Sequence, residues 1–146
     1  RPAAPSIGSV TPMPFELIAV AIAVFQRFAQ ILAVAVPRGL LFGYEWAASV
    51  RDDTPELRDI RIQRANRALQ NYRETFPIFI ALALAVVVAD VTSGVPALGA
   101  ALYVGGRIVY PFFYVFHVPF MRSIVWTIAK AGLVLLVLPL LSASVS

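Results

Sequence analysis

The chain has 146 residues, of which 60% are hydrophobic and 14% charged, and its mean hydropathy is +0.80. Soluble domains are about 45–50% apolar and roughly a quarter charged, so the composition excludes an ordinary soluble domain and indicates an integral membrane protein. The chain has no cysteine and one histidine, so we expect no disulfide, no catalytic thiol and no metal site. The net charge is +4, but eleven of the twelve cations are arginines spread along an apolar chain. Membrane topology explains this bias better than a nucleic-acid partner, and we expect none.

The chain divides into an arm, a membrane domain and a short tail. Residues 1–14, which contain four prolines, predict a flexible arm without the hydrophobic region of a signal peptide. Residues 15–142 predict one all-α membrane domain with a hydrophilic loop at 37–63, and residues 143–146 a tail. The four apolar spans of the membrane domain are expected at about residues 15–36, 64–90, 95–116 and 122–141.

The second span has a short uncharged part. Its fifteen residues from Thr75 to Ala89 cover about 22 Å of a hydrocarbon layer roughly 30 Å thick. The span must therefore take polar residues from upstream into the bilayer. The third span also contains a close-packing pattern, because Ala97, Ala101 and Gly105 are small residues at i, i+4 and i+8.

The loop arginines predict the orientation of the bundle. The turn after Asp90 contains no arginine, whereas the long loop and the entry to the second span contain Arg38, Arg51, Arg58, Arg61, Arg64 and Arg67. By the positive-inside rule the long loop is cytoplasmic and both termini are outside.

Polar residues of different spans fall at matched depths. Counted from the outer helix ends at 1.5 Å per residue, Arg27, Arg107 and Lys130 lie about 18 Å deep, Glu74 and Tyr110 about 23 Å, and Asn71 and Tyr114 about 28 Å. A charge facing lipid there costs about 2.5–3.5 kcal/mol on the insertion scale, so these groups should face protein or a ligand. The three cations of these layers accompany a single carboxylate, that of Glu74. We therefore expect water or a bound anion to compensate for the excess positive charge.

Helical spacing places these residues on common faces. On the second span Arg64, Arg67, Asn71 and Glu74 stand at i, i+3, i+7 and i+10, within roughly an 80° arc. The third span places Arg107, Tyr110 and Tyr114 at i, i+3 and i+7. We therefore expect two inward polar stripes at one level.

These residues resemble a family pattern. Residues 67–77, RALQNYRETFP, are similar to the pattern R-A-x-x-N-x-x-E-x-x-P of the membrane-associated proteins in eicosanoid and glutathione metabolism, the MAPEG family. Arg107-x-x-Tyr110-x-x-x-Tyr114 and a bacterial-type Arg51-Asp52-Asp53 support the resemblance, which covers residues from about 15 to 141.

The resemblance implies a homotrimer in the bacterial inner membrane that binds glutathione between protomers from the cytoplasmic side. Many members conjugate this thiol to lipophilic electrophiles or reduce lipid hydroperoxides, so membrane lipids and a hydrophobic small molecule are the implied partners. Arginines suit the two carboxylates of glutathione, Glu74 suits its ammonium group, and a guanidinium favours the thiolate. The implied contacts are Arg67, Asn71, Glu74, Arg107, Tyr110 and Tyr114, with Arg122 as the catalytic residue facing the thiol.

Other interpretations stay open. Some members of the family, including the lipoxygenase-activating protein, are not transferases, so the chain could be a non-catalytic lipid-binding or scaffold subunit. An anion carrier is a weaker alternative, because the four spans contain no inverted halves. Thr75 stands where the eicosanoid enzymes often have tyrosine, and Lys130 matches no family motif. Structural alternatives are a buried network for Arg67, Asn71 and Glu74, an interfacial belt for Tyr110 and Tyr114, snorkelling for Arg122, and a structural or subunit-interface cluster for Gln26, Arg27 and Gln30.

Overall fold

A computed structural model describes residues 12–52, 55–92 and 94–143, and the regular secondary structure of these residues is entirely helical. Most of the predicted arm (1–11), Asp53 and residues 144–146 of the predicted tail lie outside the described residues. The helices are α1 (Phe15–Phe42), α2 (Tyr44–Ala48), α3 (Ile60–Val88), α4 (Gly94–Val115) and α5 (Pro119–Ala143).

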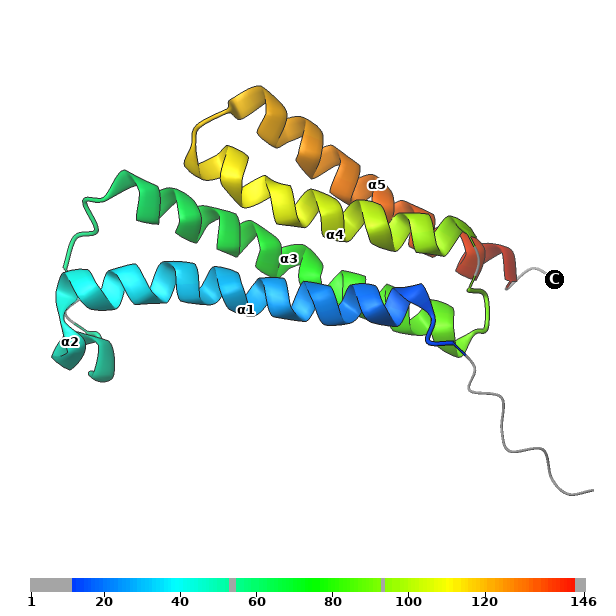
Figure 1. Cartoon of the computed structure of the whole chain (residues 1–146), viewed down its shortest axis with the longest axis horizontal. Helices are drawn as coiled ribbons and strands as arrows, with labels where there is room; N and C mark the ends of the chain where they lie inside the picture. Colours follow the sequence, from blue (N-terminus) through cyan, green and yellow to red (C-terminus); the bar gives the residue numbers. More distant parts are fainter. Residues whose placement is uncertain (1–11, 53–54, 93, 144–146) are drawn as a thin grey trace, which may run out of the picture.

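Four of these helices are long and apolar enough to cross a membrane. Figure 1 shows α1, α3, α4 and α5 side by side in alternating directions, with α2 beside the end of α1. We call the end that holds α2 and the α4–α5 turn the loop end, and the opposite end, where α3 meets α4, the Asp90 end. The predicted all-α, four-helix membrane fold is confirmed.

The helices extend into the segment predicted as a loop at 37–63. The first helix continues through Pro37 to Phe42, where Gly43 has φ +89°, and α3 begins at Ile60 rather than near residue 64. Asp59 caps α3, because its carboxylate accepts hydrogen bonds from the backbone N–H groups of Arg61 (2.8 Å) and Ile62 (3.3 Å). A hydrophilic composition indicated a loop here, but polar residues also form helix ends outside the hydrocarbon layer.

Two turns reverse the chain between the last three helices. Asp90 (φ +53°) follows α3 and His117 (φ +59°) follows α4, both with left-handed backbone. The next residues close each end, since the N–H of Val91 donates to the carbonyl of Val86 (3.1 Å) and that of Val118 to Phe113 (3.0 Å). These are the hydrogen bonds of a Schellman motif.

The α4 and α5 helices pack with their backbones in contact. A Cβ atom on Gly99 would lie 2.7 Å from the carbonyl oxygen of Gly132, and one on Gly132 would lie 2.5 Å from that of Gly99. The predicted close-packing face does not form this contact: within the single chain Ala101 is exposed, and a Cβ on Gly105 would meet nothing within 4 Å. The spacing identified a run of small residues, but the register of α4 against α5 brings Gly99, which is not part of that run, into the contact.

A core between α1, α3 and α4 fixes the rotation of α3. Phe79 and Tyr103 stack with ring centroids 4.2 Å apart, and the hydroxyl of Tyr72 donates to the carbonyl of Ala23 (3.0 Å). Since Tyr72 and Phe79 face this core, the stripe of Arg67, Asn71 and Glu74 lies on another face of α3.

Candidate functional site

A cavity of about 560 Å³ lies between α3, α4 and α5, and we call it the polar cavity. Six of the seven predicted site residues line it. Its lining residues are Arg67, Gln70, Asn71 and Glu74 of α3, Tyr110 and Tyr114 of α4, and Arg122, Ser123, Trp126 and Thr127 of α5.

The α3 side chains that line the polar cavity are at least partly exposed at the surface of the single chain. Arg67 and Glu74 are exposed and Asn71 is half-buried, whereas Ala68 and Thr75, each the next residue along α3 and on an adjoining face, are buried. The helical period thus separates a charged face from a packed one. The charged face belongs to a helix apolar enough to cross a membrane, so it needs a covering surface or a ligand.

Arg107 is not among the lining residues. It is 1% exposed and lies behind Asn71, to whose Oδ1 its Nη1 donates (2.8 Å). Its Nη2 donates to the hydroxyl of Thr75, and its guanidinium lies 5.4–5.6 Å from the ring centroids of Tyr72, Tyr103 and Tyr110. Arg107 therefore holds the Oδ1 of Asn71, which leaves the amide nitrogen as the donor toward the cavity.

The α4 wall consists of two tyrosines in contact. The ring centroids of Tyr110 and Tyr114 are 5.6 Å apart, and Tyr110 is only 5% exposed. Such burial argues against an interfacial belt role for Tyr110. The guanidinium of Arg122 lies 4.9 Å from the ring centroid of Tyr114, which links α5 to this wall. This contact holds Arg122 against the cavity and argues against snorkelling away from it.

A smaller hollow of about 260 Å³ continues the polar cavity to the loop end. It shares Arg67, Tyr114 and Arg122 with the polar cavity and reaches His117 in the α4–α5 turn. Arg64 also lines it and donates from Nη1 to the carbonyl of Val115 (3.2 Å). The shared residues make a cationic path from the loop end into the polar cavity.

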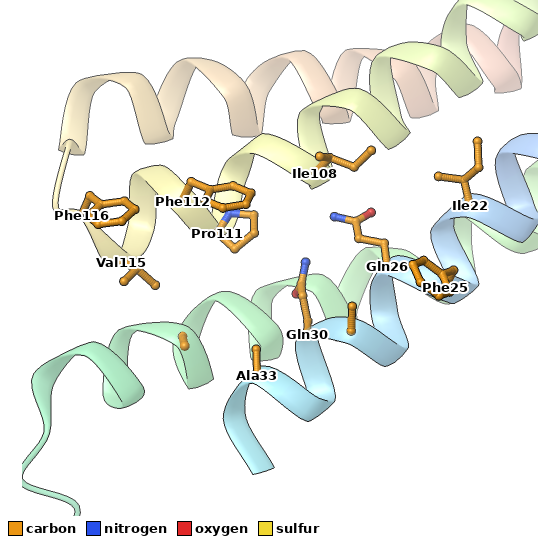
Figure 2. Close-up of a pocket in the computed structure, with 12 residues that line it drawn as sticks. Ile22, Phe25, Gln26, Gln30, Ala33, Ile108, Pro111, Phe112, Val115 and Phe116 are labelled. Atoms are coloured by element: carbon orange, nitrogen blue, oxygen red, sulfur yellow. The ribbon is translucent and has the colours of Figure 1, made fainter. Parts of the chain in front are cut away.

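A second large hollow, the apolar groove, lies between α1 and α4 and has a volume of about 580 Å³. Figure 2 shows Gln26 and Gln30 directed from α1 toward α4 in otherwise apolar surroundings. Among the described residues, Gln26 Nε2 and Gln30 Oε1 are buried without a hydrogen-bond partner. Arg27 does not join them, since its guanidinium packs over the rings of Tyr72 and Phe76 at 5.8 and 5.4 Å.

Four lining residues of the polar cavity were not predicted from the sequence. Gln70 follows Arg67 by three positions, and Ser123, Trp126 and Thr127 follow Arg122 by one, four and five. Helical spacing from Arg122 would have identified the three α5 residues if the face of α5 directed toward α3 had been known. Within the described ranges, no three His, Cys, Asp or Glu side chains could hold a metal ion. The cavity therefore offers guanidinium, amide, hydroxyl and carboxylate groups.

These features define a class: multi-pass membrane proteins with a polar site inside a four-helix bundle. The family model of the MAPEG family matches residues 15–142, and the chain belongs to this family. Comparison with curated proteins and with solved structures found no match.

Proposed function

We propose that this MAPEG protein is a membrane-bound glutathione transferase that activates the thiol of glutathione for attack on lipophilic electrophiles or lipid hydroperoxides. The observation that carries the proposal is the convergence of Arg67, Arg122, Asn71 and Glu74, from two helices, on one cavity of about 560 Å³. That volume lies within the usual range of small-molecule sites, which is roughly 300–1,000 Å³.

The charges of the cavity complement those of glutathione. Arg67 and Arg122 supply two guanidinium groups for the two carboxylates, and Glu74 supplies one carboxylate for the ammonium group. The Asn71 amide nitrogen, which Arg107 leaves available, suits a peptide carbonyl of the ligand. With Arg107 behind this wall, its proposed role is to position Asn71 rather than to contact glutathione.

In the proposed reaction Arg122 stabilises the glutathione thiolate. The thiol proton leaves to water, and the sulfur lone pair forms a carbon–sulfur bond while the electrophile's leaving group or opened oxygen takes the displaced electron pair. With a hydroperoxide, the thiolate attacks the terminal oxygen, and a second glutathione completes the disulfide, releasing an alcohol and water. The guanidinium favours the thiolate by lowering the thiol pKa below its usual value of about 8.5.

The proposed assembly is a homotrimer in the bacterial inner membrane, with the loop end cytoplasmic and both termini outside. The exposure of Arg67, Gln70 and Glu74 on a membrane helix supports it, because a neighbouring copy would remove these groups from lipid. The cationic hollow at the loop end supports entry of glutathione from the cytoplasm.

A non-catalytic lipid-binding or scaffold role is the second candidate. The apolar groove favours lipid binding, because about 580 Å³ of mostly hydrophobic space lies between α1 and α4. In that case the polar groups of the cavity would serve assembly with another membrane complex.

Ultraviolet absorbance tests the proposed chemistry. Titration of the purified protein with glutathione should give the absorbance of a bound thiolate, and Arg122→Ala should lower it. Arg58→Ala is the matched control, because Arg58 is exposed and its ion pair with Glu56 (3.6 Å) lies outside the cavity. Thiolate absorbance unchanged in Arg122→Ala would remove the role of Arg122, and absence of any bound thiolate in the parent would contradict the proposed activation.

A further inference from the structure

The cationic hollow is the space of about 260 Å³ that continues the polar cavity to the loop end. Three arginines and one histidine line it, and none of its described lining residues is acidic. The four residues are Arg64, Arg67, Arg122 and His117. Guanidinium groups around one small space repel one another unless an anion lies between them, so the lining indicates the charge of the ligand.

The acidic residues of α3 and of the segment directly before it do not offset this charge. Glu74 lines the polar cavity but not the hollow, and it follows Arg67 by seven positions, about 10 Å along the helix. The carboxylate of Asp59 caps α3, and that of Glu56 pairs with Arg58 (3.6 Å). The guanidinium groups of the hollow therefore exceed the negative charge beside them.

Two of the arginines are held in place by contacts of their own. Arg64 donates from Nη1 to the carbonyl of Val115 (3.2 Å), which leaves its Nε and Nη2 for another acceptor. The guanidinium of Arg122 packs over the ring of Tyr114 at 4.9 Å. Because these contacts order side chains from α3 and α5 before any ligand arrives, an anion between them has less side-chain entropy to offset.

The first turn of α5 adds to the positive potential of the hollow. This helix begins at Pro119, and Val118 and Pro119 line the hollow together with Arg122. The free N–H groups at a helix N-terminus carry partial positive charge and favour an anion there. At the opposite pole, the carbonyl of Val115 at the end of α4 is already paired with Arg64.

The lining favours a phosphate group over a zwitterion. A ligand with an ammonium group needs a carboxylate, which Glu74 offers in the polar cavity, whereas the hollow offers donors only. A phosphate monoester carries a charge of about −1.5 to −2 at pH 7 and has three strong acceptor oxygens. Guanidinium forks from α3 and α5 can each meet different oxygens of such a group.

The hollow lies at the level of lipid headgroups. At 1.5 Å per residue, Arg64 stands about 36 Å along α3 from Val88, beyond a hydrocarbon layer roughly 30 Å thick. Ile60 and Val118, which also line the hollow, are 48% and 38% exposed and give it an apolar rim. A phosphate can therefore reach the arginines from solution or as the headgroup of an anionic phospholipid.

We propose that the cationic hollow binds a phosphate monoester, and that the bound phosphate excludes glutathione from the polar cavity. Arg67, Tyr114 and Arg122 line both spaces, so one ligand occupies groups that the other needs. The hollow thus regulates the proposed function. The exclusion rests on that function, whereas phosphate binding itself requires no glutathione.

Equilibrium dialysis against the detergent-solubilised protein tests the site, at constant ionic strength set with chloride. One arm uses radiolabelled inorganic phosphate, and the other radiolabelled dihexanoyl phosphatidic acid with dihexanoyl phosphatidylcholine as its control. The parent should bind phosphate saturably, and Arg64→Gln should bind it about tenfold or more weakly, the effect of losing one charge-assisted hydrogen bond. Arg58→Ala should bind as the parent does.

The two arms distinguish the sources of the phosphate. Equal affinity for both ligands identifies free phosphate as sufficient, whereas an affinity for phosphatidic acid tenfold higher or more identifies the lipid headgroup. The site is overturned if the parent binds neither ligand saturably at millimolar concentration, or if Arg64→Gln binds as tightly as the parent. Equal binding of phosphatidylcholine and phosphatidic acid, with no binding of inorganic phosphate, overturns it as well. The measurements on the parent decide the matter even if Arg64→Gln does not fold.

Glutathione binding separates this site from the proposed function. If the parent binds phosphate but no glutathione, the proposed function fails and the phosphate site stands. If glutathione binds while neither phosphate ligand binds or displaces it, the site fails and the proposed function stands. Phosphate binding that leaves the affinity for glutathione unchanged would contradict the exclusion and place the phosphate outside the shared residues.

Discussion

At the scale of single residues, Arg107 and Thr75 form the support of the candidate site. The hydroxyl of Thr75 accepts from Arg107 and lies 3.1 Å from the hydroxyl of Tyr103, and Thr75 is 5% exposed. A tyrosine, which the eicosanoid enzymes often have at this position, would need room that Arg107 and Tyr103 occupy. The threonine of this chain instead fits between Arg107 and Tyr103 and contacts both behind Asn71.

Thr75→Val is expected to destabilise the protein. Valine keeps the shape of threonine but leaves a buried donor of Arg107 without its acceptor, which costs about 1–3 kcal/mol. Thermal unfolding in detergent should show a lower midpoint than the parent, and Thr75→Ser should restore most of the loss. A midpoint for Thr75→Val equal to that of the parent would contradict the supporting role of this hydroxyl.

The face of α3 that carries the site could be predicted from the sequence, whereas the depth of each side chain could not. The spacing of Arg67, Asn71 and Glu74 placed them together, and the structure has them around one cavity. Helical spacing also placed Arg107 on one stripe with Tyr110, yet Arg107 is buried behind Asn71. Helical periodicity gives the direction of a side chain around its axis, whereas the distance to the neighbouring helix decides whether it lines a cavity or fills the core.

At the scale of helices, the contact between Gly99 and Gly132 sets the separation of α4 and α5. Gly132→Ala would place a Cβ 2.5 Å from a backbone carbonyl and 2.8 Å from the backbone nitrogen of Tyr103, so the helices must separate. We expect a loss of about 1–3 kcal/mol in the free energy of unfolding, the usual range for overpacking. Denaturation monitored by circular dichroism measures this loss.

Gly105→Ala is the matched control for this contact. It lies on the same helix as Gly99, but its Cβ would meet nothing within 4 Å. Alanine should then stabilise α4 by up to about 1 kcal/mol through its higher helix propensity. Equal effects of the two substitutions would contradict the packing described for α4 and α5.

Helix number could be predicted from hydropathy, whereas helix ends depended on local detail. The cap of Asp59 and the left-handed backbone of Gly43 set ends that composition alone did not indicate. The α5 wall of the polar cavity was also missed, because the register of α5 against α3 arises from packing and leaves no periodic signal. Trp126 and Thr127 show this, since nothing in their own spacing connects them to Glu74.

At the scale of the whole molecule, the proposed orientation follows from the arginine bias of the loop end. Because the chain has no cysteine, single cysteines can report it. In bacterial cells, Thr92→Cys should react with a membrane-impermeant maleimide from outside, and Glu56→Cys only after the inner membrane is permeabilised. Labelling of Glu56→Cys in intact spheroplasts would reverse the proposed topology.

In the proposed function the polar cavity receives a small zwitterionic thiol. Equilibrium dialysis of labelled glutathione against the detergent-solubilised protein tests it most directly, with Glu74→Gln as the variant and Arg58→Ala as the control. We expect saturable binding by the parent and the control, and binding weaker by about tenfold or more in Glu74→Gln, the effect of losing one charge-assisted hydrogen bond. No saturable binding at millimolar glutathione, or equal affinity in Glu74→Gln and the parent, would contradict it.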